Sequence, residues 1–176
     1  MKKTILLFAL ALITVATVGV SEVYAQKPSP KMTAEGTNVS VAYGQPSKRG
    51  RVIFGKEGSG SLEPYGKVWR TGANEATEIT FKKDAMFGGK PVKAGTYSLY
   101  SIPGEKEWTV ILNPELKQWG AFGYDKVKDK NVAEVTVPTK MYDTSAEKLM
   151  FDVKNDNKLS FQWDKMGFEV PITYQK

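Results

Sequence analysis

The feature that most constrains the fold is a series of short strand-like runs that begins near residue 37. Each run alternates apolar and polar side chains or is rich in β-branched residues, as expected of half-buried strands. Clusters of glycine, proline, asparagine and aspartate separate the runs. The runs cover residues 37–43, 51–54, 67–71, 77–82, 96–102, 107–112, 132–137, 148–153, 158–163 and 168–174. This spacing predicts an all-β fold, either a single antiparallel β-sandwich of jelly-roll type or a flattened barrel, with about eight to ten strands.

Several local features refine this prediction. The short segments at 103–106 and 155–157 each predict a hairpin between two neighbouring runs. Only residues 114–118 look helical. Alternation in the run at 107–112 places Trp108, Val110 and Leu112 on one face, which predicts that Trp108 packs in the core.

The N-terminus has the order of a secretory signal peptide. Two lysines precede an apolar run at residues 5–20, and a small-residue pattern typical of a signal-peptide cleavage site follows at 23–25. We predict a signal peptide at 1–25 that is cleaved after Ala25, a flexible lead-in at 26–36 and a single β-sandwich domain at 37–176. An uncleaved anchor is the alternative. The expected location is the periplasm or the outside of the cell.

The composition excludes much chemistry. The sequence contains no cysteine and no histidine, which rules out disulfides, thiol nucleophiles, a lipoprotein cysteine, Ser-His-Asp catalysis and the common zinc sites. We therefore expect no cofactor and no metal. The formal charge of +6 comes from lysines interspersed with acids, which indicates a soluble surface rather than a nucleic-acid partner. No membrane span is expected after cleavage.

The uneven distribution of arginine is the most informative feature of the sequence that follows the predicted signal peptide. Arg49, Arg51 and Arg70 are the only arginines in the chain, and all three fall between residues 45 and 77. The planar guanidinium group suits fixed, bidentate contacts with carboxylates or phosphates better than lysine does. These arginines are therefore candidate clamps, either within the protein or on a ligand.

The candidate ligand-binding residues come from this arginine-bearing segment: Arg49, Arg51, Tyr65, Trp69, Arg70, Asn74, Glu75 and Thr77. If residues 67–71 are extended, Val68 and Arg70 share one face, and Trp69 and Thr71 share the other. In a structural interpretation, Trp69 is in the core and Arg70 pairs with Glu75 or Glu78. In a functional one, Trp69 stacks on a ligand while polar neighbours supply hydrogen bonds.

Three functions follow from these patterns. The leading hypothesis is a non-catalytic β-sandwich that binds a small molecule, a glycan or an envelope protein. A second is a carboxylate-dependent glycoside hydrolase, for which Glu75 and Asp125 are the nominal pair. A third is a structural envelope protein whose arginines only join its own strands.

Four stretches carry a resemblance to a known family. They read YGQPSKRGRVIFG, PYGKVWRTGANEATEITF, AGTYSLYSIPGEKEWTVILN and QWGAFGYD, and the likeness extends over residues 41–172. Together they resemble the domain of unknown function 2911, which is common in exported proteins of Bacteroidetes-like bacteria. The resemblance implies an exported domain and brings no catalytic residues with it.

Overall fold

The computed structural model describes residues 28–174, so the predicted signal peptide and its cleavage point lie outside the described residues. Within that range the chain forms twelve strands and two 3-10 helices. The strands are β1 (Lys31–Glu35), β2 (Val39–Gly44), β3 (Phe54–Gly55), β4 (Glu63–Pro64), β5 (Thr77–Phe81), β6 (Ala85–Phe87), β7 (Lys90–Val92), β8 (Gly95–Ile102), β9 (Glu107–Asn113), β10 (Ala133–Pro138), β11 (Lys140–Asp152) and β12 (Lys158–Tyr174). The helices are η1 (Tyr124–Lys126) and η2 (Lys128–Lys130).

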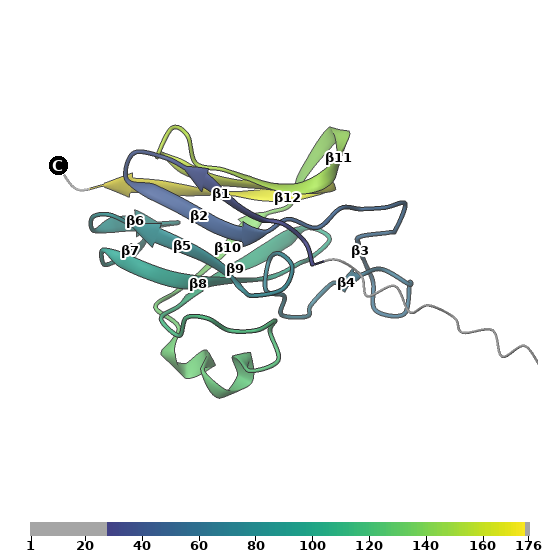
Figure 1. Ribbon diagram of the computed structural model, residues 1–176, viewed down its shortest axis with the longest axis horizontal. Helices are drawn as coiled ribbons and strands as arrows, with labels where there is room; N and C mark the ends of the chain where they lie inside the picture. The colour runs from purple at the N-terminus through teal and green to yellow at the C-terminus, as the bar shows by residue number, and fades with distance from the viewer. Residues whose placement is uncertain (1–27, 175–176) are drawn as a thin grey trace, which may run out of the picture.

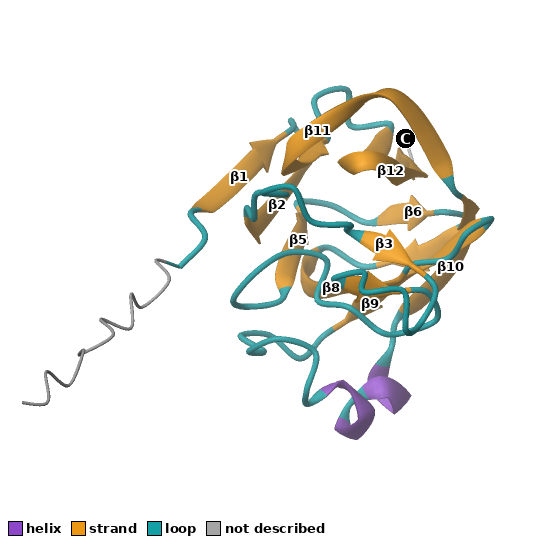
Figure 2. Cartoon of the chain, turned by 90° about the vertical axis from the view of Figure 1, so that its right-hand side faces the viewer, coloured by secondary structure: helices purple, strands orange, loops and turns teal. Residues whose placement is uncertain are grey.

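The strands form two antiparallel sheets that lie as two layers (Figure 1). One sheet has six strands in the order β1-β2-β5-β8-β9-β10, and the other has four in the order β11-β12-β6-β7. A short parallel pair, β3 with β4, lies at one end of the layers. The two helices lie away from the sheets, below them in Figure 2. The predicted all-β sandwich is confirmed, and the sheets do not close into a barrel.

Aromatic side chains fill the space between the layers. Phe161 on β12 is at its centre, with ring centroids 5.5 Å from Trp108, 5.2 Å from Phe151 and 4.9 Å from Phe168. Trp108 on β9 is fully buried, as its alternation predicted. Because large rings bury much apolar area and interlock, this cluster holds the two sheets together.

Both predicted hairpins are present. β8 and β9 pair antiparallel across residues 103–106, and β11 and β12 pair across residues 155–157. The runs predicted at 158–163 and 168–174 form one continuous strand, β12. No helix among the described residues has the length and apolar character needed to cross a membrane.

Three local predictions are wrong. The run predicted at 67–71 forms no strand and has only an isolated bridge between Trp69 and Ser101. Residues 31–35, predicted within the flexible lead-in, form β1, which pairs antiparallel with β2. Residues 114–118, predicted as helical, form an irregular turn in which Asn113 Oδ1 accepts a hydrogen bond from the Glu115 amide at 2.9 Å. Lys117 then adopts a φ of 57°, which lies outside the range of a right-handed helix.

We expect Phe161→Ala to lower the free energy of unfolding by about 3–5 kcal/mol, because the truncation leaves a cavity among rings that cannot collapse into it. Urea unfolding followed by tryptophan fluorescence measures the loss. Met141→Ala, on the exposed part of β11, is the control and should change the free energy by less than about 0.5 kcal/mol. Equal effects of the two variants would contradict the central role of Phe161.

Candidate functional site

All three arginines line one hollow of about 250 Å³ at the edge of the sandwich. We call it the arginine hollow. It lies beside the four-stranded sheet, since Trp163 of β12 forms part of its wall. Its lining residues are Pro28, Ser29, Pro46, Ser47, Arg49, Arg51, Leu62, Glu63, Arg70, Gly72, Ala73, Asn74 and Trp163.

The loop that carries Arg49 is held by hydrogen bonds to β11. The Lys48 amide donates to the Glu147 carbonyl at 2.7 Å, and the Arg49 amide donates to Glu147 Oε1 at 2.9 Å. The Leu149 amide donates in turn to the Pro46 carbonyl at 3.1 Å. These bonds fix the loop that carries Arg49, while its side chain stays exposed.

Arg51 is oriented by the same loop. Its Nε donates to the Lys48 carbonyl at 3.0 Å, and its Nη2 donates to the Ser47 carbonyl at 2.7 Å. Two contacts to fixed carbonyl groups restrict a side chain that would otherwise lose much rotamer entropy on binding. The guanidinium group is therefore oriented before any ligand arrives.

Arg70 owes its position to its neighbour Trp69. Trp69 and Ser101 exchange two backbone hydrogen bonds of 2.8 and 2.9 Å, so this short stretch is extended. Adjacent side chains in an extended chain point to opposite sides. Trp69 is 3% exposed in the core, and Arg70 is half-buried at the hollow. Among residues 28–174, the buried Nε of Arg70 has no hydrogen-bond partner.

A tight turn follows Arg70, and its residues 72–74 form part of the wall of the arginine hollow. The Ala73 amide donates to the Gly44 carbonyl at 3.1 Å, and a side chain at Gly44 would collide with the Ala73 backbone. Thr77 Oγ1 donates to the Thr71 carbonyl at 2.9 Å. Asn74, at a φ of 65°, donates through Nδ2 to the Ser29 carbonyl at 3.0 Å. The turn is thus fixed to β2 and to the first described residues.

One carboxyl group, that of Glu63 on β4, lies in the arginine hollow. Burial raises the pKa of Glu63 to about 7, and the charges of Arg70 and Arg51 oppose this rise. Removal from water therefore outweighs the attraction of two cations, neither of which forms an ion pair with Glu63 among the described residues. Near neutral pH, Glu63 sets how positive the hollow is.

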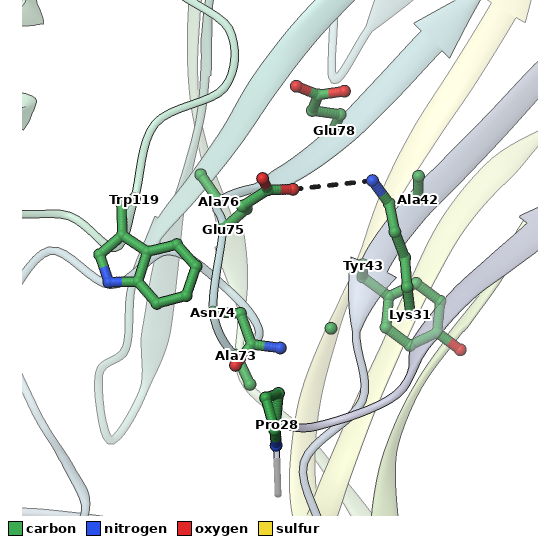
Figure 3. A pocket seen from close by; sticks show the side chains of 11 residues that line it. Pro28, Lys31, Ala42, Tyr43, Ala73, Asn74, Glu75, Ala76, Glu78 and Trp119 are labelled. Atoms are coloured by element: carbon green, nitrogen blue, oxygen red, sulfur yellow. Dashed lines mark ion pairs between the residues drawn. The ribbon is translucent and has the colours of Figure 1, made fainter.

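A second hollow, of about 300 Å³, adjoins the first and contains Trp119 (Figure 3). We call it the tryptophan hollow. Trp119 lies on one side of it, and Lys31 and Tyr43 lie on the other. Its lining residues are Pro28, Lys31, Ala42, Tyr43, Gly44, Ala73, Asn74, Glu75, Ala76, Glu78 and Trp119. Pro28, Ala73 and Asn74 line both hollows.

Four of the eight predicted site residues meet at the arginine hollow: Arg49, Arg51, Arg70 and Asn74. Glu75 instead lines the tryptophan hollow.

The other three predicted residues do not line either hollow. Trp69 is in the core, where its ring stacks on Trp163 at 5.9 Å and 17°. Thr77 is fully buried. Tyr65 packs against the core, and its hydroxyl lies 3.5 Å from the Met166 sulfur.

The ion pair suggested for Arg70 does not form. Glu75 lies 3.6 Å from Lys31 Nζ, and Glu78 accepts a hydrogen bond from the Lys117 amide at 3.2 Å. The two carboxylates nominated for hydrolysis, Glu75 and Asp125, also have separate surroundings. Asp125 pairs with Lys128 at 3.3 Å and does not line the hollow that holds Glu75. Within residues 28–174, no group of acidic side chains is placed to hold a metal ion.

Sequence reasoning missed Glu63, Trp119 and Trp163. Glu63 follows a glycine- and serine-rich loop and has no pattern that separates it from other surface acids. Trp119 belongs to the stretch QWGAFGYD, whose composition was visible but whose exposure was not. Trp163 lies two residues after Phe161, so both side chains face the core in a strand. Nothing in that pattern indicates that Trp163 also borders a hollow.

Comparison with known proteins identifies a single family over most of the chain. A family model described as "Protein of unknown function (DUF2911)" matches residues 26–172. No curated protein and no solved structure matches significantly.

The raised pKa of Glu63 predicts a specific pH dependence of stability. The native state binds the Glu63 proton more tightly than the unfolded chain, whose carboxyl titrates near 4.5. Native protein therefore holds more protons between pH 4.5 and about 7. The contribution of Glu63 is fully present below pH 4.5 and is lost as the pH rises to about 7, by up to roughly 3 kcal/mol.

Urea unfolding of the wild type and Glu63→Gln across pH 4.5–8 tests this, since the neutral variant should become relatively more stable as the pH rises. Glu57→Gln is the control, because Glu57 is an exposed acid paired with Lys67. A constant difference between wild type and Glu63→Gln at every pH would show that Glu63 titrates alike in both states.

Proposed function

We propose that this chain, which belongs to the DUF2911 family, is a non-catalytic binding protein that takes a small anionic molecule into its arginine hollow. One observation carries the proposal. The only three arginines of the sequence line one hollow, and every ion pair among residues 28–174 is made by a lysine instead. Guanidinium groups that form no ion pair with a described acid are available to an external anion.

The chemistry of the arginine hollow favours a carboxylate, phosphate or sulfate group. Arg51 is oriented by the two carbonyl groups that accept from its Nε and Nη2, and no described residue accepts from its Nη1. Arg70 carries a buried N–H that no described residue accepts. Hydrogen bonds between ionised partners are about twice as strong as neutral ones, and planar forks match such anions. The Nδ2 group of Asn74 is held by Ser29, which keeps its side chain at the edge of the hollow.

Binding is favoured over catalysis by the groups that surround the hollow. Histidine and cysteine are absent from the sequence, and Glu63 is the single acid among the lining residues. A pair of carboxylates that could divide the roles of acid and nucleophile is therefore missing from this described hollow.

A purely structural role for the arginines explains less. Arg51 does join backbone groups of its own loop through Ser47 and Lys48. Arg70, however, forms no ion pair among the described residues and leaves its buried Nε without a partner. An unpartnered buried N–H costs free energy, so a side chain kept only for stability would be better satisfied.

We expect sulfate to bind and to raise the melting temperature in a concentration-dependent way. Arg70→Gln should weaken sulfate binding at least about tenfold, because one charge-assisted contact is lost. Lys67→Gln removes the same charge from a lysine that lines neither hollow and serves as the matched control. Isothermal titration and thermal shift measure both variants.

The pH response gives a second readout of the same site. Wild-type affinity for sulfate should rise as the pH falls from 8 to 5.5, since Glu63 loses its negative charge there while sulfate keeps both of its own. Glu63→Gln should bind at pH 8 as the wild type binds at pH 5.5. Equal losses in Arg70→Gln and Lys67→Gln, or an unchanged pH profile in Glu63→Gln, would exclude the arginine hollow as the anion site.

We further propose that the protein works outside the cytoplasm after removal of residues 1–25. Expression of the full chain in a bacterial host should give periplasmic or secreted protein whose intact mass begins at Gln26. A variant with Leu7→Lys interrupts the apolar run and should remain unprocessed. An intact wild-type chain of 176 residues in the cytoplasmic fraction would contradict export.

A further inference from the structure

The tryptophan hollow presents its aromatic ring in a fixed orientation. The Ala76 amide donates to the Gln118 carbonyl at 2.8 Å, and the Gly120 amide donates to the Asn74 carbonyl at 3.1 Å. These two bonds are made by the residues on either side of Trp119, so Trp119 and Glu75 form an isolated antiparallel β-bridge. The backbone is therefore held while Trp119 remains 66% exposed. Such a ring offers stacking area at little entropic cost, because its support is already ordered.

The polar groups around this ring are arranged at the rim. Lys31 Nζ and Glu75 Oε2 lie 3.6 Å apart across the opening, so one hydrogen-bond donor and one acceptor face the same space (Figure 3). Asn74 and Glu78 add further polar groups, whereas the alanines of the lining are apolar. An apolar floor with a few convergent polar groups is the usual composition of a small-molecule site, and about 300 Å³ is at the lower end of the usual size.

A pyranose ring matches this combination. One of its faces carries C–H groups that pack on the face of an aromatic ring, and its edge carries hydroxyls that both donate and accept hydrogen bonds. A flat aromatic ligand would use the indole equally well but would make no hydrogen bond to the remaining donors of Lys31 or the remaining acceptors of Glu75. The rim chemistry therefore favours a sugar.

The two hollows are neighbours, since Pro28, Ala73 and Asn74 line both of them. A ligand that extends past the turn at Ala73 and Asn74 leaves the tryptophan hollow and reaches the arginines. We infer that the ligand is an acidic saccharide, with one pyranose ring stacked on Trp119 and the anionic group of an adjoining sugar held by the arginines. This inference rests on the proposed anion-binding function and names the ligand class for it.

The test uses the processed full-length protein and a panel of oligosaccharides with matched acidic and neutral members. Galacturonate, glucuronate-containing and sulfated-galactose oligomers are titrated beside their uncharged counterparts of the same length. The acidic members should bind at least about tenfold more tightly than the neutral ones. Within the panel, the uronic acids and the sulfated sugars separate carboxylate from sulfate recognition.

Variants separate the two parts of the ligand. Trp119→Ala should weaken binding of the acidic oligosaccharide about tenfold and leave sulfate binding unchanged, whereas Trp119→Phe should retain most of the affinity. Arg70→Gln should weaken both ligands. Phe122→Ala is the control, because Phe122 is 87% exposed three residues after Trp119 and lines neither hollow.

Each result decides one of the two proposals. If no acidic oligosaccharide binds more tightly than sulfate, or if Trp119→Ala binds the oligosaccharide as the wild type does, the saccharide inference is wrong and the anion site stands. If Arg70→Gln leaves sulfate and oligosaccharide binding unchanged, the anion site itself is wrong. Melting temperatures of the Trp119 variants check folding, which should be unaffected because the indole is exposed.

Discussion

The paired backbone hydrogen bonds between Trp69 and Ser101 are the contact on which the site depends. They attach an otherwise irregular segment to β8 and turn the Trp69 ring into the core, where it stacks on Trp163. Once that ring is inside, the next side chain, Arg70, must face outward. The chain then reverses in a turn that needs a φ of 54° at Thr71 and of 65° at Asn74. Both hollows are built around this turn.

Sequence alternation predicted the strands that have one buried face. β2, β5 and β10 bury every second side chain, and each was predicted to within two residues at either end. β1 is almost wholly exposed, so it has no apolar face to detect. The first part of β11 is also largely exposed. Only the C-terminal end of this strand, with Leu149 and Phe151, enters the core. Edge strands paired mainly through their backbones leave little trace in a sequence.

The candidate site was predictable only as far as residue type indicated function. The scarcity of arginine pointed to Arg49, Arg51 and Arg70, and the structure brings these three together. Neither Glu63 nor Trp119 could be singled out, because the surroundings of each depend on loops that return from distant parts of the chain. Trp69 shows the converse: the sequence left both a core role and a ligand contact open for it, and its ring is part of the core.

Both hollows lie near the N-terminal end of the described chain, because Pro28 lines each of them. The C-terminal end of β12 lies far from the β3–β4 pair, whose Glu63 lines the arginine hollow (Figure 1). Pro28 contributes to the wall of each hollow, and Ser29 accepts the hydrogen bond of Asn74. A tag or surface tether fused immediately before residue 28 would therefore crowd the entrance to both. Attachment beyond Tyr174, where β12 pairs with β6, leaves that entrance clear for immobilised protein.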